Sequence, residues 1–328
     1  MINTKISIAM ATYNGARFLK EQLDSIAAQI RLPDELIICD DGSTDETPDL
    51  INKFINNSPF PIKLILNKIN WGYAKNFEKA IQLCEGDIVA LADQDDIWYP
   101  NKLMRIQEIF ENQDKIGLVF SNSQLINEVG IEVGRTLWER GGFNKKRETA
   151  FRSNPFLEII KGPLITGMTT AFRTKYIPKI IPIGKSWHHD AWIALLMSLL
   201  TKVEPIPEIL QAYRVHNSQQ TYVPLKGKLP RASIQERAKR FQEASIRYEI
   251  IARHIYSWND NILIQYAVPI LKNKAKNKRV RAMAYSKNIY WHVILKELFS
   301  GGYHKYASGW RGALGDILRI AKPTNKDY

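Results

Sequence analysis

The sequence is poor in cysteine, and this limits the kinds of site that it can carry. Its 328 residues include only Cys39 and Cys84, and both lie in apolar segments. Neither has a second cysteine or a histidine at a spacing typical of metal ligands. The pattern argues against a cysteine-based metal site and favours a reducing, cytoplasmic location.

Long apolar runs are also absent. A helix that crosses a membrane needs roughly 20 consecutive apolar residues, and the sequence contains no such run. The first five residues lead straight into an apolar segment, without the charged start and long apolar core of a signal peptide. We therefore expect a cytoplasmic protein whose contact with the cell membrane, if it has one, is peripheral and at the inner face.

Acidic residues are scarce in the last third of the chain. Residues 225–328 contain 21 Lys and Arg but 7 Asp and Glu, whereas residues 1–224 contain 25 and 26. The whole excess of positive charge thus belongs to the C-terminal third, which predicts an anionic partner for that part alone. We predict two domains, an α/β domain over 1–224 and a basic, mainly helical module over 225–328.

The first part of the chain alternates apolar stretches with helical patterns. Strands are predicted at 6–11, 36–39, 62–66, 87–92 and 117–121. The alternation indicates parallel βαβ units in a doubly wound sheet, where ligands bind outside the carboxyl ends of the strands. Three of these ends are polar, and we expect them to converge on one crevice: Thr12-Tyr13-Asn14, Asp40-Asp41 and Asp93-Gln94-Asp95.

The third of these ends carries an unusual concentration of carboxylates. Asp93, Asp95 and Asp96 follow directly on the apolar run 88–92. Side chains alternate along a strand, so Asp93 and Asp95 point the same way. Their repulsion favours a hard divalent cation, Mg²⁺ or Mn²⁺, that bridges to phosphate oxygens. The alternative is that Asp96 caps the following helix, which leaves Asp93 and Asp95 unexplained.

Five short motifs, in order over residues 5–222, together resemble the family 2 glycosyltransferases of the GT-A fold. They are Thr12-Tyr13-Asn14, Asp40-Asp41-Gly42-Ser43, Asp93-Gln94-Asp95, His189-Asp190 and Tyr213-Arg214-Val215-His216. The last resembles the closing motif of a bacterial subgroup that includes rhamnosyltransferase-like enzymes. The resemblance implies a Rossmann-like mixed sheet flanked by helices, followed here by the C-terminal helical module.

The resemblance also assigns roles to particular residues. It implies that Asp41 contacts the nucleotide base, Asp93 the ribose and Asp95 the metal, and that Asp190 is the catalytic base. His216 is a further candidate for the metal. The remaining candidates are, for the nucleotide, Ala11, Thr12, Tyr13, Asn14 and Gln94, and, for the substrate, Trp98, Gly167, His189, Trp192 and Arg214.

Several of these residues have a purely structural alternative. His216 is also explained as a surface histidine after a strand, and Asp190 as the N-cap of a helix over 191–200. Trp192 is at least as well explained by core packing as by stacking on a sugar. Arg214 fits a structural ion pair as well as a phosphate contact.

The family resemblance predicts a metal-dependent, inverting glycosyltransferase. The donor would be a UDP- or dTDP-sugar, with rhamnose as one candidate, and the acceptor a lipid-linked or growing surface polysaccharide. The residues after the closing histidine, 217–220, depart from the subgroup pattern, which leaves the sugar open. The alternative function is a non-catalytic, sugar-nucleotide-binding or scaffold subunit of a polysaccharide assembly complex.

The basic module combines positive charge with aromatic residues. Seven Lys and Arg between 272 and 287 precede the aromatic and apolar stretch 289–299. This order predicts an interfacial amphipathic helix and peripheral membrane contact through 272–328. The alternative is a soluble helical bundle with a solvated basic face. Nucleic acid is not a predicted partner, because the aromatics are not interleaved with the charges and no nucleic-acid motif is present.

Overall fold

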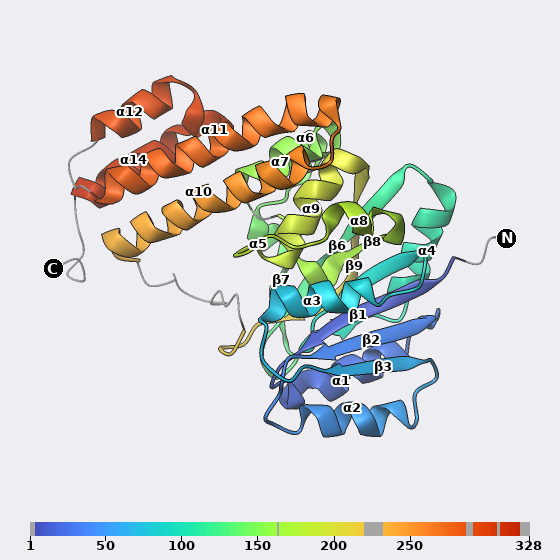
Figure 1. The fold of residues 1–328 in the computed structure, drawn as a ribbon. Helices are drawn as coiled ribbons and strands as arrows, with labels where there is room; N and C mark the ends of the chain where they lie inside the picture. Colours follow the sequence, from blue (N-terminus) through green and yellow to red (C-terminus); the bar gives the residue numbers. More distant parts are fainter. Residues whose placement is uncertain (1–3, 163, 220–231, 287–290, 307–308, 322–328) are drawn as a thin grey trace. The chain divides into compact units, whose positions relative to one another are not determined.

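The computed structural model (Figure 1) describes most of the chain, namely residues 4–162, 164–219, 232–286, 291–306 and 309–321. The chain forms two compact units. The first comprises 1–159, 163–183 and 188–227, and the second comprises 160–162, 184–187 and 228–328. The predicted boundary between residues 224 and 225 lies outside the described residues, so its position stays a prediction.

The first unit is built on one nine-stranded sheet. Its strands are β1 (Ile6–Thr12), β2 (Glu35–Asp40), β3 (Ile62–Leu66), β4 (Ile88–Ala92), β5 (Ile97–Trp98), β6 (Ile116–Ile126), β7 (Glu132–Thr136), β8 (Thr170–Arg173) and β9 (Lys202–Arg214). Its helices are α1 (Ala16–Ala27), α2 (Thr47–Ile55), α3 (Tyr73–Gln82), α4 (Lys102–Asn112), α5 (Leu137–Gly141), α6 (Lys145–Ser153), α7 (Pro155–Lys161), η1 (Gly167–Thr169), η2 (Thr174–Tyr176), α8 (Ile177–Ile180) and α9 (His189–Leu200).

The sheet is mixed, as the family resemblance implied. The strand order is β3-β2-β1-β4-β8-β6-β9-β5, with β7 paired to β6. Strands β3, β2, β1 and β4 are mutually parallel, while β8 runs antiparallel to both β4 and β6. Right-handed crossovers place α1 and α2 on one face and α3 on the other (Figure 1). The predicted fold class is confirmed.

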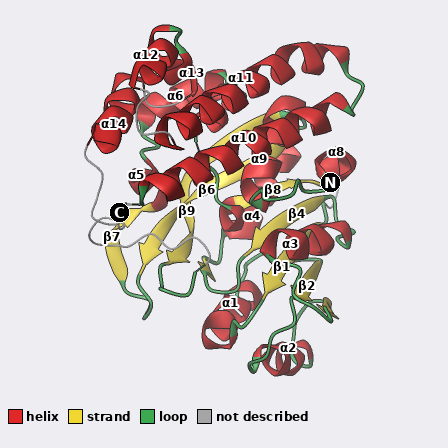
Figure 2. Cartoon of the chain, turned by 60° about the vertical axis from the view of Figure 1, so that its left-hand side comes forward, coloured by secondary structure: helices red, strands yellow, loops and turns green. Residues whose placement is uncertain are grey.

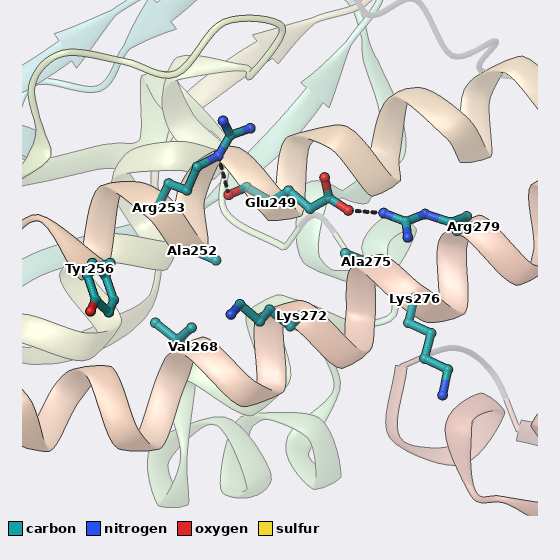
Figure 3. A pocket seen from close by; sticks show the side chains of 9 residues that line it. All are labelled: Glu249, Ala252, Arg253, Tyr256, Val268, Lys272, Ala275, Lys276 and Arg279. Atoms are coloured by element: carbon teal, nitrogen blue, oxygen red, sulfur yellow. Dashed lines mark hydrogen bonds and ion pairs between the residues drawn. The ribbon is translucent and has the colours of Figure 1, made fainter.

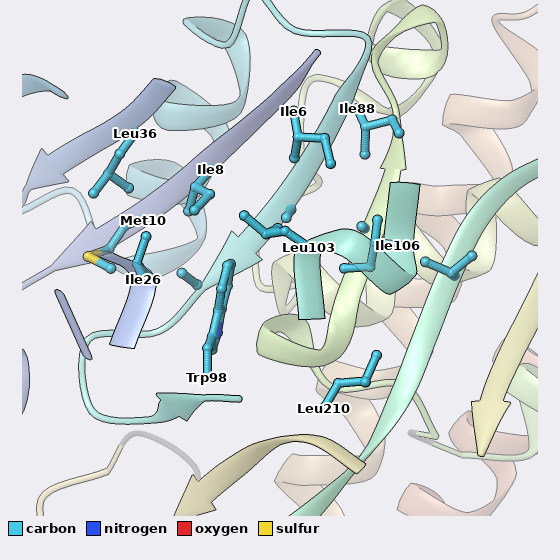
Figure 4. Close-up of a cluster of buried hydrophobic side chains, with 14 of the residues drawn as sticks. Ile6, Ile8, Met10, Ile26, Leu36, Ile88, Trp98, Leu103, Ile106 and Leu210 are labelled. Atoms are coloured by element: carbon cyan, nitrogen blue, oxygen red, sulfur yellow. The ribbon is translucent and has the colours of Figure 1, made fainter. Parts of the chain in front are cut away.

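The main core of this unit lies between the sheet and helices α1 and α4. Alternate residues of β1 (Ile6, Ile8 and Met10) point into it, because side chains of a strand alternate between the two faces (Figure 4). The helical spacing of Leu103 and Ile106 brings α4 onto the same cluster. Parallel strands are buried on both faces, which explains why β4 is apolar along its whole length.

The segment from 126 to 160, which shows no clear alternation in the sequence, is nevertheless structured. It contains β7, α5, α6 and α7, which have 5, 5, 9 and 7 residues. Side-chain caps start two of these short helices, since Thr136 accepts from Glu139 N and Asn144 accepts from Arg147 N. Elements this short and polar leave little periodic signal, and local capping defines them instead.

The second unit is helical (Figure 2). Its helices are α10 (Ile234–Tyr256), α11 (Asn261–Ser286), α12 (Trp291–Phe299), α13 (Gly302–Tyr306) and α14 (Gly309–Ala321). A capping box between Ser233 and Glu236 begins α10. No helix in the described ranges combines the length and the apolarity that crossing a membrane requires.

The basic residues between 272 and 287 are not all exposed. All but Lys287, which lies outside the described residues, belong to α11. Lys274 is 1% exposed and donates to the carbonyl oxygen of Tyr306, and burial lowers its pKa well below the ordinary value. Ile294 and Leu298 of α12 are also buried. These residues pack inside a helical bundle, because a helix turns every 3.6 residues and part of any run faces inward, and the predicted membrane contact stays a prediction.

One buried carboxylate joins three helices of the second unit. Asp316 of α14 accepts from the hydroxyls of Tyr285 (2.8 Å) and Tyr303 (2.7 Å) and from Arg281 Nε (2.8 Å). Its side chain is almost fully buried. These charge-assisted hydrogen bonds replace the hydration that the carboxylate loses.

We predict that Asp316→Asn destabilises the second unit by about 3 kcal/mol, because it leaves the partly buried Arg281 without its counter-charge. Urea unfolding followed by circular dichroism would measure the loss. The matched control is Glu243→Gln, which removes a carboxylate from an exposed position of α10. A change below about 0.5 kcal/mol in both variants would show that Asp316 does not hold these helices together.

Candidate active site

Hydrogen bonds bring the three polar strand ends together. The backbone N–H of Tyr13 donates to Gln94 Oε1 (2.9 Å), and Gln94 Nε2 donates back to the Tyr13 carbonyl (3.1 Å). Asn14 N donates to Ser43 Oγ (2.8 Å), and Asn14 Oδ1 accepts from Thr44 N (2.8 Å). The predicted convergence of the loops after β1, β2 and β4 is therefore confirmed.

Two special backbone positions make this convergence possible. Asn14 adopts a φ of 46°, a left-handed conformation that asparagine tolerates better than most residues. A Cβ atom on Gly15 would overlap the side-chain amide of Gln94, so only glycine allows the loop after β4 to approach so closely. The turn after β1 is thus shaped to hold Gln94.

The two carboxylates at the end of β2 hold loops in place. Asp40 accepts from Thr12 Oγ1 (2.7 Å) and from the backbone and hydroxyl of Ser43. Asp41 accepts from Trp71 N (2.9 Å), Gly72 N (2.8 Å) and Asn67 Nδ2 (3.0 Å). Both residues are buried. The structure gives Asp41 the role of fixing the loop before α3, and its predicted contact with a nucleotide base stays a prediction.

Three carboxylates follow β4, and a fourth, Asp190, lies near them. Burial and the neighbouring carboxylates of Asp95 and Asp190 raise the pKa of Asp93 to about 8. Asp96 is fully buried, and burial together with Asp95 and Asp93 raises its pKa well above the ordinary value. Asp190 comes from α9, a hundred residues further along the chain, so the fold assembles this cluster from two separate segments.

Asp96 does not cap a helix. Helix α4 begins at Lys102 with Asn101 at its N-cap position, and Asp96 Oδ1 accepts from the backbone N–H of Arg214 (2.9 Å). Its second oxygen has no hydrogen-bond partner among the described residues. The capping alternative is therefore wrong, and Asp96 ties the loop after β4 to the end of β9.

His216 lies against the acidic cluster. Its Nε2 is 2.8 Å from Asp95 Oδ2, its Nδ1 is 2.8 Å from Ser218 Oγ, and its ring centroid is 4.7 Å from that of Phe18. The residue is buried, so the alternative of a surface histidine is wrong. The two predicted metal-binding residues are thus neighbours in space, although 121 positions separate them.

Asp190 lies in the first turn of α9. Its Oδ2 accepts from Gly167 N (3.2 Å), and its Oδ1 accepts from Ala191 N (2.6 Å). A Cβ on Gly167 would clash with Nε2 of His189, so glycine is required where η1 passes this helix. His189 stacks on Phe77, and its ring nitrogens have no partner among the described residues. Burial lowers its pKa to about 4, which keeps the imidazole neutral.

Three predicted substrate-binding residues have structural contacts. Trp98 and Trp192 are 2% and 1% exposed, and Trp192 Nε1 donates to the Ile180 carbonyl (2.6 Å). Arg214 is 1% exposed, donates to the carbonyls of Asp95 and Glu128, and pairs with Glu21 (2.6 Å). The core packing expected for Trp192 and the ion pair expected for Arg214 are present, and the predicted contacts of the three residues with a substrate stay predictions.

Lys102, at the start of α4, is a further buried residue of this site. Its ammonium group is fully buried, lies 3.7 Å from the centre of the Trp98 ring and donates to the Met168 carbonyl (2.7 Å). Burial lowers its pKa well below the ordinary value, and Asp96 and Asp93 oppose that shift. Its one sequence signal is a lysine at the first position of a helix, where the helix dipole disfavours a cation. The sequence analysis missed this residue.

The donor set at this site fits a hard divalent cation. No group of three or more His, Cys, Asp or Glu side chains in the described ranges forms a complete metal cluster. A cation such as Mg²⁺ commonly takes one or two carboxylates from the protein and its other ligands from phosphates and water. Asp95 and His216 supply a carboxylate oxygen and an imidazole nitrogen, and burial together with the charges of Asp95 and Asp190 raises the pKa of the neighbouring Asp93.

We predict that Lys102→Met destabilises the first unit by about 3–5 kcal/mol, since it leaves the buried carboxylates without their compensating charge. Urea unfolding would measure the loss. The control is Lys115→Met on an exposed lysine, which should change stability by less than about 0.5 kcal/mol. Equal stability of the two variants would show that the Lys102 ammonium group compensates nothing.

Comparison with known proteins establishes the family. Residues 7–179 match the family described as "Glycosyl transferase family 2". The match covers more than half of the chain, and the chain belongs to this family. The predicted enzyme class, glycosyltransferase, is thereby confirmed at the level of the family.

Relatives with moderate sequence similarity cover only part of the chain. An uncharacterized glycosyltransferase of Nostoc sp. (strain PCC 7120) is 29% identical over 65% of this chain and 66% of its own. An Escherichia coli protein, UDP-Glc:alpha-D-GlcNAc-diphosphoundecaprenol beta-1,3-glucosyltransferase WfgD, is 32% identical over 38% of this chain and 48% of its own. The chain thus spans about half to two thirds of the length of these two relatives.

Solved structures share the fold over nearly the whole chain. S. aureus TarS 1-349 in complex with UDP-GlcNAc has a TM-score of 0.56 at 15% identity, covering 96% of this chain and 92% of that one. The mannosyltransferase PcManGT from Pyrobaculum calidifontis, in complex with GDP-Man and Mn2+, has a TM-score of 0.53 at 16% identity and covers 97% and 87%. At such identities the likeness concerns the fold alone.

Proposed function

We propose that this protein is a metal-dependent, inverting glycosyltransferase that takes a sugar from a nucleoside diphosphate donor. The observation that carries the proposal is the assembly of Asp93, Asp95 and Asp190 around one point, with His216 bonded to Asp95. Repulsion between neighbouring carboxylates is unfavourable unless a bound cation, which also binds phosphate, balances their charge.

The donor nucleotide is proposed to lie along the turn after β1. Tyr13 is 43% exposed and Asn14 is exposed beside it, while Ala11, Thr12 and Gln94 form the framework behind them. In sheets of this kind ligands occupy the carboxyl ends of the strands. Asp41 and Asp93 complete the proposed contacts, with the base and the ribose respectively. The complex of TarS with UDP-GlcNAc, a structure of the same fold, supports this class of donor.

Asp95 and His216 are the proposed ligands of a divalent cation. When bound there, the cation would supply Lewis-acid charge to the departing diphosphate. His216 is oriented for this role because Ser218 contacts its other ring nitrogen, as the outer partners of metal-binding histidines commonly do. The complex of PcManGT with GDP-Man and Mn2+ supports the use of a divalent metal.

Asp190 is the proposed general base. Two backbone N–H groups orient its carboxylate, from Gly167 and from Ala191, so each oxygen keeps a free lone pair for the acceptor hydroxyl. The hydroxyl loses its proton to Asp190 as its oxygen bonds to the anomeric carbon and the bond to the diphosphate breaks. A single displacement of this kind inverts the configuration at that carbon.

The acceptor is proposed to be a lipid-linked or growing surface polysaccharide. The name of WfgD, a diphosphoundecaprenol-dependent glucosyltransferase, supports this class. We further propose a UDP- or dTDP-sugar as donor, with rhamnose as a candidate because the motif Tyr213–His216 resembles the rhamnosyltransferase-like subgroup. Such acceptors occur at the inner face of the cell membrane, which supports a cytoplasmic protein with peripheral contact through 272–328.

We predict that Asp190→Asn lowers sugar transfer by about 10²–10⁴-fold, because the amide cannot accept the proton. Binding of the UDP-, dTDP- or GDP-sugar that the wild-type protein prefers should change by less than about twofold. Transfer to an envelope fraction of the source cells and donor titration would measure the two effects. Asp49→Asn, on an exposed residue of α2, is the control. Unchanged transfer in cells would favour the scaffold alternative.

We predict that Asp95→Asn weakens Mn²⁺ binding at least about tenfold, since it removes the charged ligand. Calorimetric titration of Mn²⁺ in the presence of UDP would measure this, with Asp49→Asn again as the control. His216→Ala should weaken binding in the same direction. Equal affinity for Mn²⁺ in the wild-type and Asp95→Asn proteins would place the metal elsewhere or exclude it from this site.

A further inference from the structure

A groove of about 580 Å³ lies between α10 and α11 of the second unit (Figure 3). Its wall on α10 is formed by Glu249, Ala252, Arg253 and Tyr256, and its wall on α11 by Val268, Lys272, Ala275, Lys276 and Arg279. The small side chains Ala252 and Ala275 account for the space, since longer residues there would fill the gap between the helices. A volume of this size suits a small ligand or part of a larger one.

The charge of the groove is positive and largely uncompensated. Of its four cationic side chains, Arg279 forms an ion pair with Glu249, and Arg253 donates only to the Glu249 carbonyl (3.4 Å). Within the described residues, Lys272 and Lys276 form no ion pair. Figure 3 shows Lys272 extending between the two helices toward Ala252 and Val268. Its ammonium group therefore lies at the solvent-exposed mouth of the groove.

The groove also has an apolar component. Ala252, Val268 and Ala275 are buried and form its floor. Near the turn that joins α10 to α11, Tyr256 is 67% exposed and Ile262 is 80% exposed. A site for a small inorganic anion would need only the cations, whereas an apolar floor that leads to exposed apolar side chains suits an amphiphile.

We propose that this groove binds the phosphate headgroup of an anionic lipid, with Lys272 on the phosphate, Lys276 adding positive charge at the edge of the groove, and the lipid chain along Ala252 and Val268. The inference deepens the proposed membrane contact by giving it a defined site, and it does not depend on the active-site assignments. Lysine acts as a point charge toward phosphate, so the site accepts phosphomonoesters and phosphodiesters alike.

The test separates the groove from the membrane by using a lipid that is soluble as a monomer. Dihexanoyl phosphatidic acid, below its micellar concentration, is titrated into the full-length protein. We expect a Kd below about 1 mM for the wild-type protein and a loss of at least about tenfold in Lys272→Glu/Lys276→Glu. The matched control, Lys239→Glu/Arg240→Glu, makes the same charge change on an exposed part of α10 and should weaken binding by less than about threefold.

Each other outcome overturns the proposal. Equal weakening by both pairs would mean diffuse attraction to a basic surface. Binding of inorganic phosphate as tight as that of the lipid would mean an anion site with no role for the apolar floor. All four substituted residues are exposed, so a melting temperature within a few degrees of wild type confirms that each variant is folded.

Vesicles distinguish the groove from the wider membrane contact. Vesicles that contain phosphatidylglycerol should retain the wild-type protein and release the Lys272→Glu/Lys276→Glu variant at lower salt. Retention of both proteins, with no binding of the monomeric lipid, would overturn the groove and leave the membrane contact standing. Binding of the monomer without retention on vesicles would support the groove and overturn the membrane contact. Sugar transfer to a soluble acceptor is expected to be the same in all variants.

Discussion

The buried ammonium group of Lys102 is the interaction on which the arrangement of the candidate active site depends. Asp96 is buried and Asp93 is half-buried, and the charge of Lys102 opposes the rise in the pKa of both carboxylates. In a low-dielectric interior an uncompensated charge costs several kcal/mol, so the loop after β4 requires this lysine to keep its shape. The hydrogen bond from Lys102 to the Met168 carbonyl extends the effect to η1, and Gly167 of η1 orients Asp190. One cation thus connects the carboxylates proposed for the donor with the one proposed for the acceptor.

The single charge of Lys102 compensates the neighbouring carboxylates only in part. The pKa of Asp93 stays raised to about 8 although Lys102 opposes the shift, because burial disfavours the charged carboxylate and Asp95 and Asp190 add further negative charge. A fold selected for stability alone would not gather carboxylates in this way. The excess is best explained by a positive group that the protein binds and does not encode. His216 supports the same proposal, since its Nε2 lies 2.8 Å from Asp95 Oδ2 and imidazole nitrogen is a common metal ligand.

The sequence predicted those features that depend on local periodicity or on strand ends. The parallel strands, the convergence of the three polar turns and the proximity of Asp93 to Asp95 all follow from period-two alternation and from the rule that strands of a parallel sheet end at one edge. The burial of individual polar or aromatic residues could not be predicted from these two rules. Trp98, Arg214 and Lys274 are residue types that often lie at a surface or in a ligand site. Only tertiary contacts with distant segments bury them. Lys102 was missed for the same reason, because its partners at positions 93, 96 and 168 meet it only in the folded chain.

The distribution of charge in the second unit shows why net charge and charged surface are different quantities. The basic run in α11 looks continuous in sequence, yet Lys274 is buried against Tyr306 and Arg281 is neutralised by Asp316. Helical geometry removes these residues from the surface and leaves Lys272, Lys276 and Arg279 along one line of α11, at spacings of four and three residues. The positive charge of the C-terminal third is therefore divided between the interior of the unit, the edge of the groove, and exposed positions such as Lys239 and Arg240.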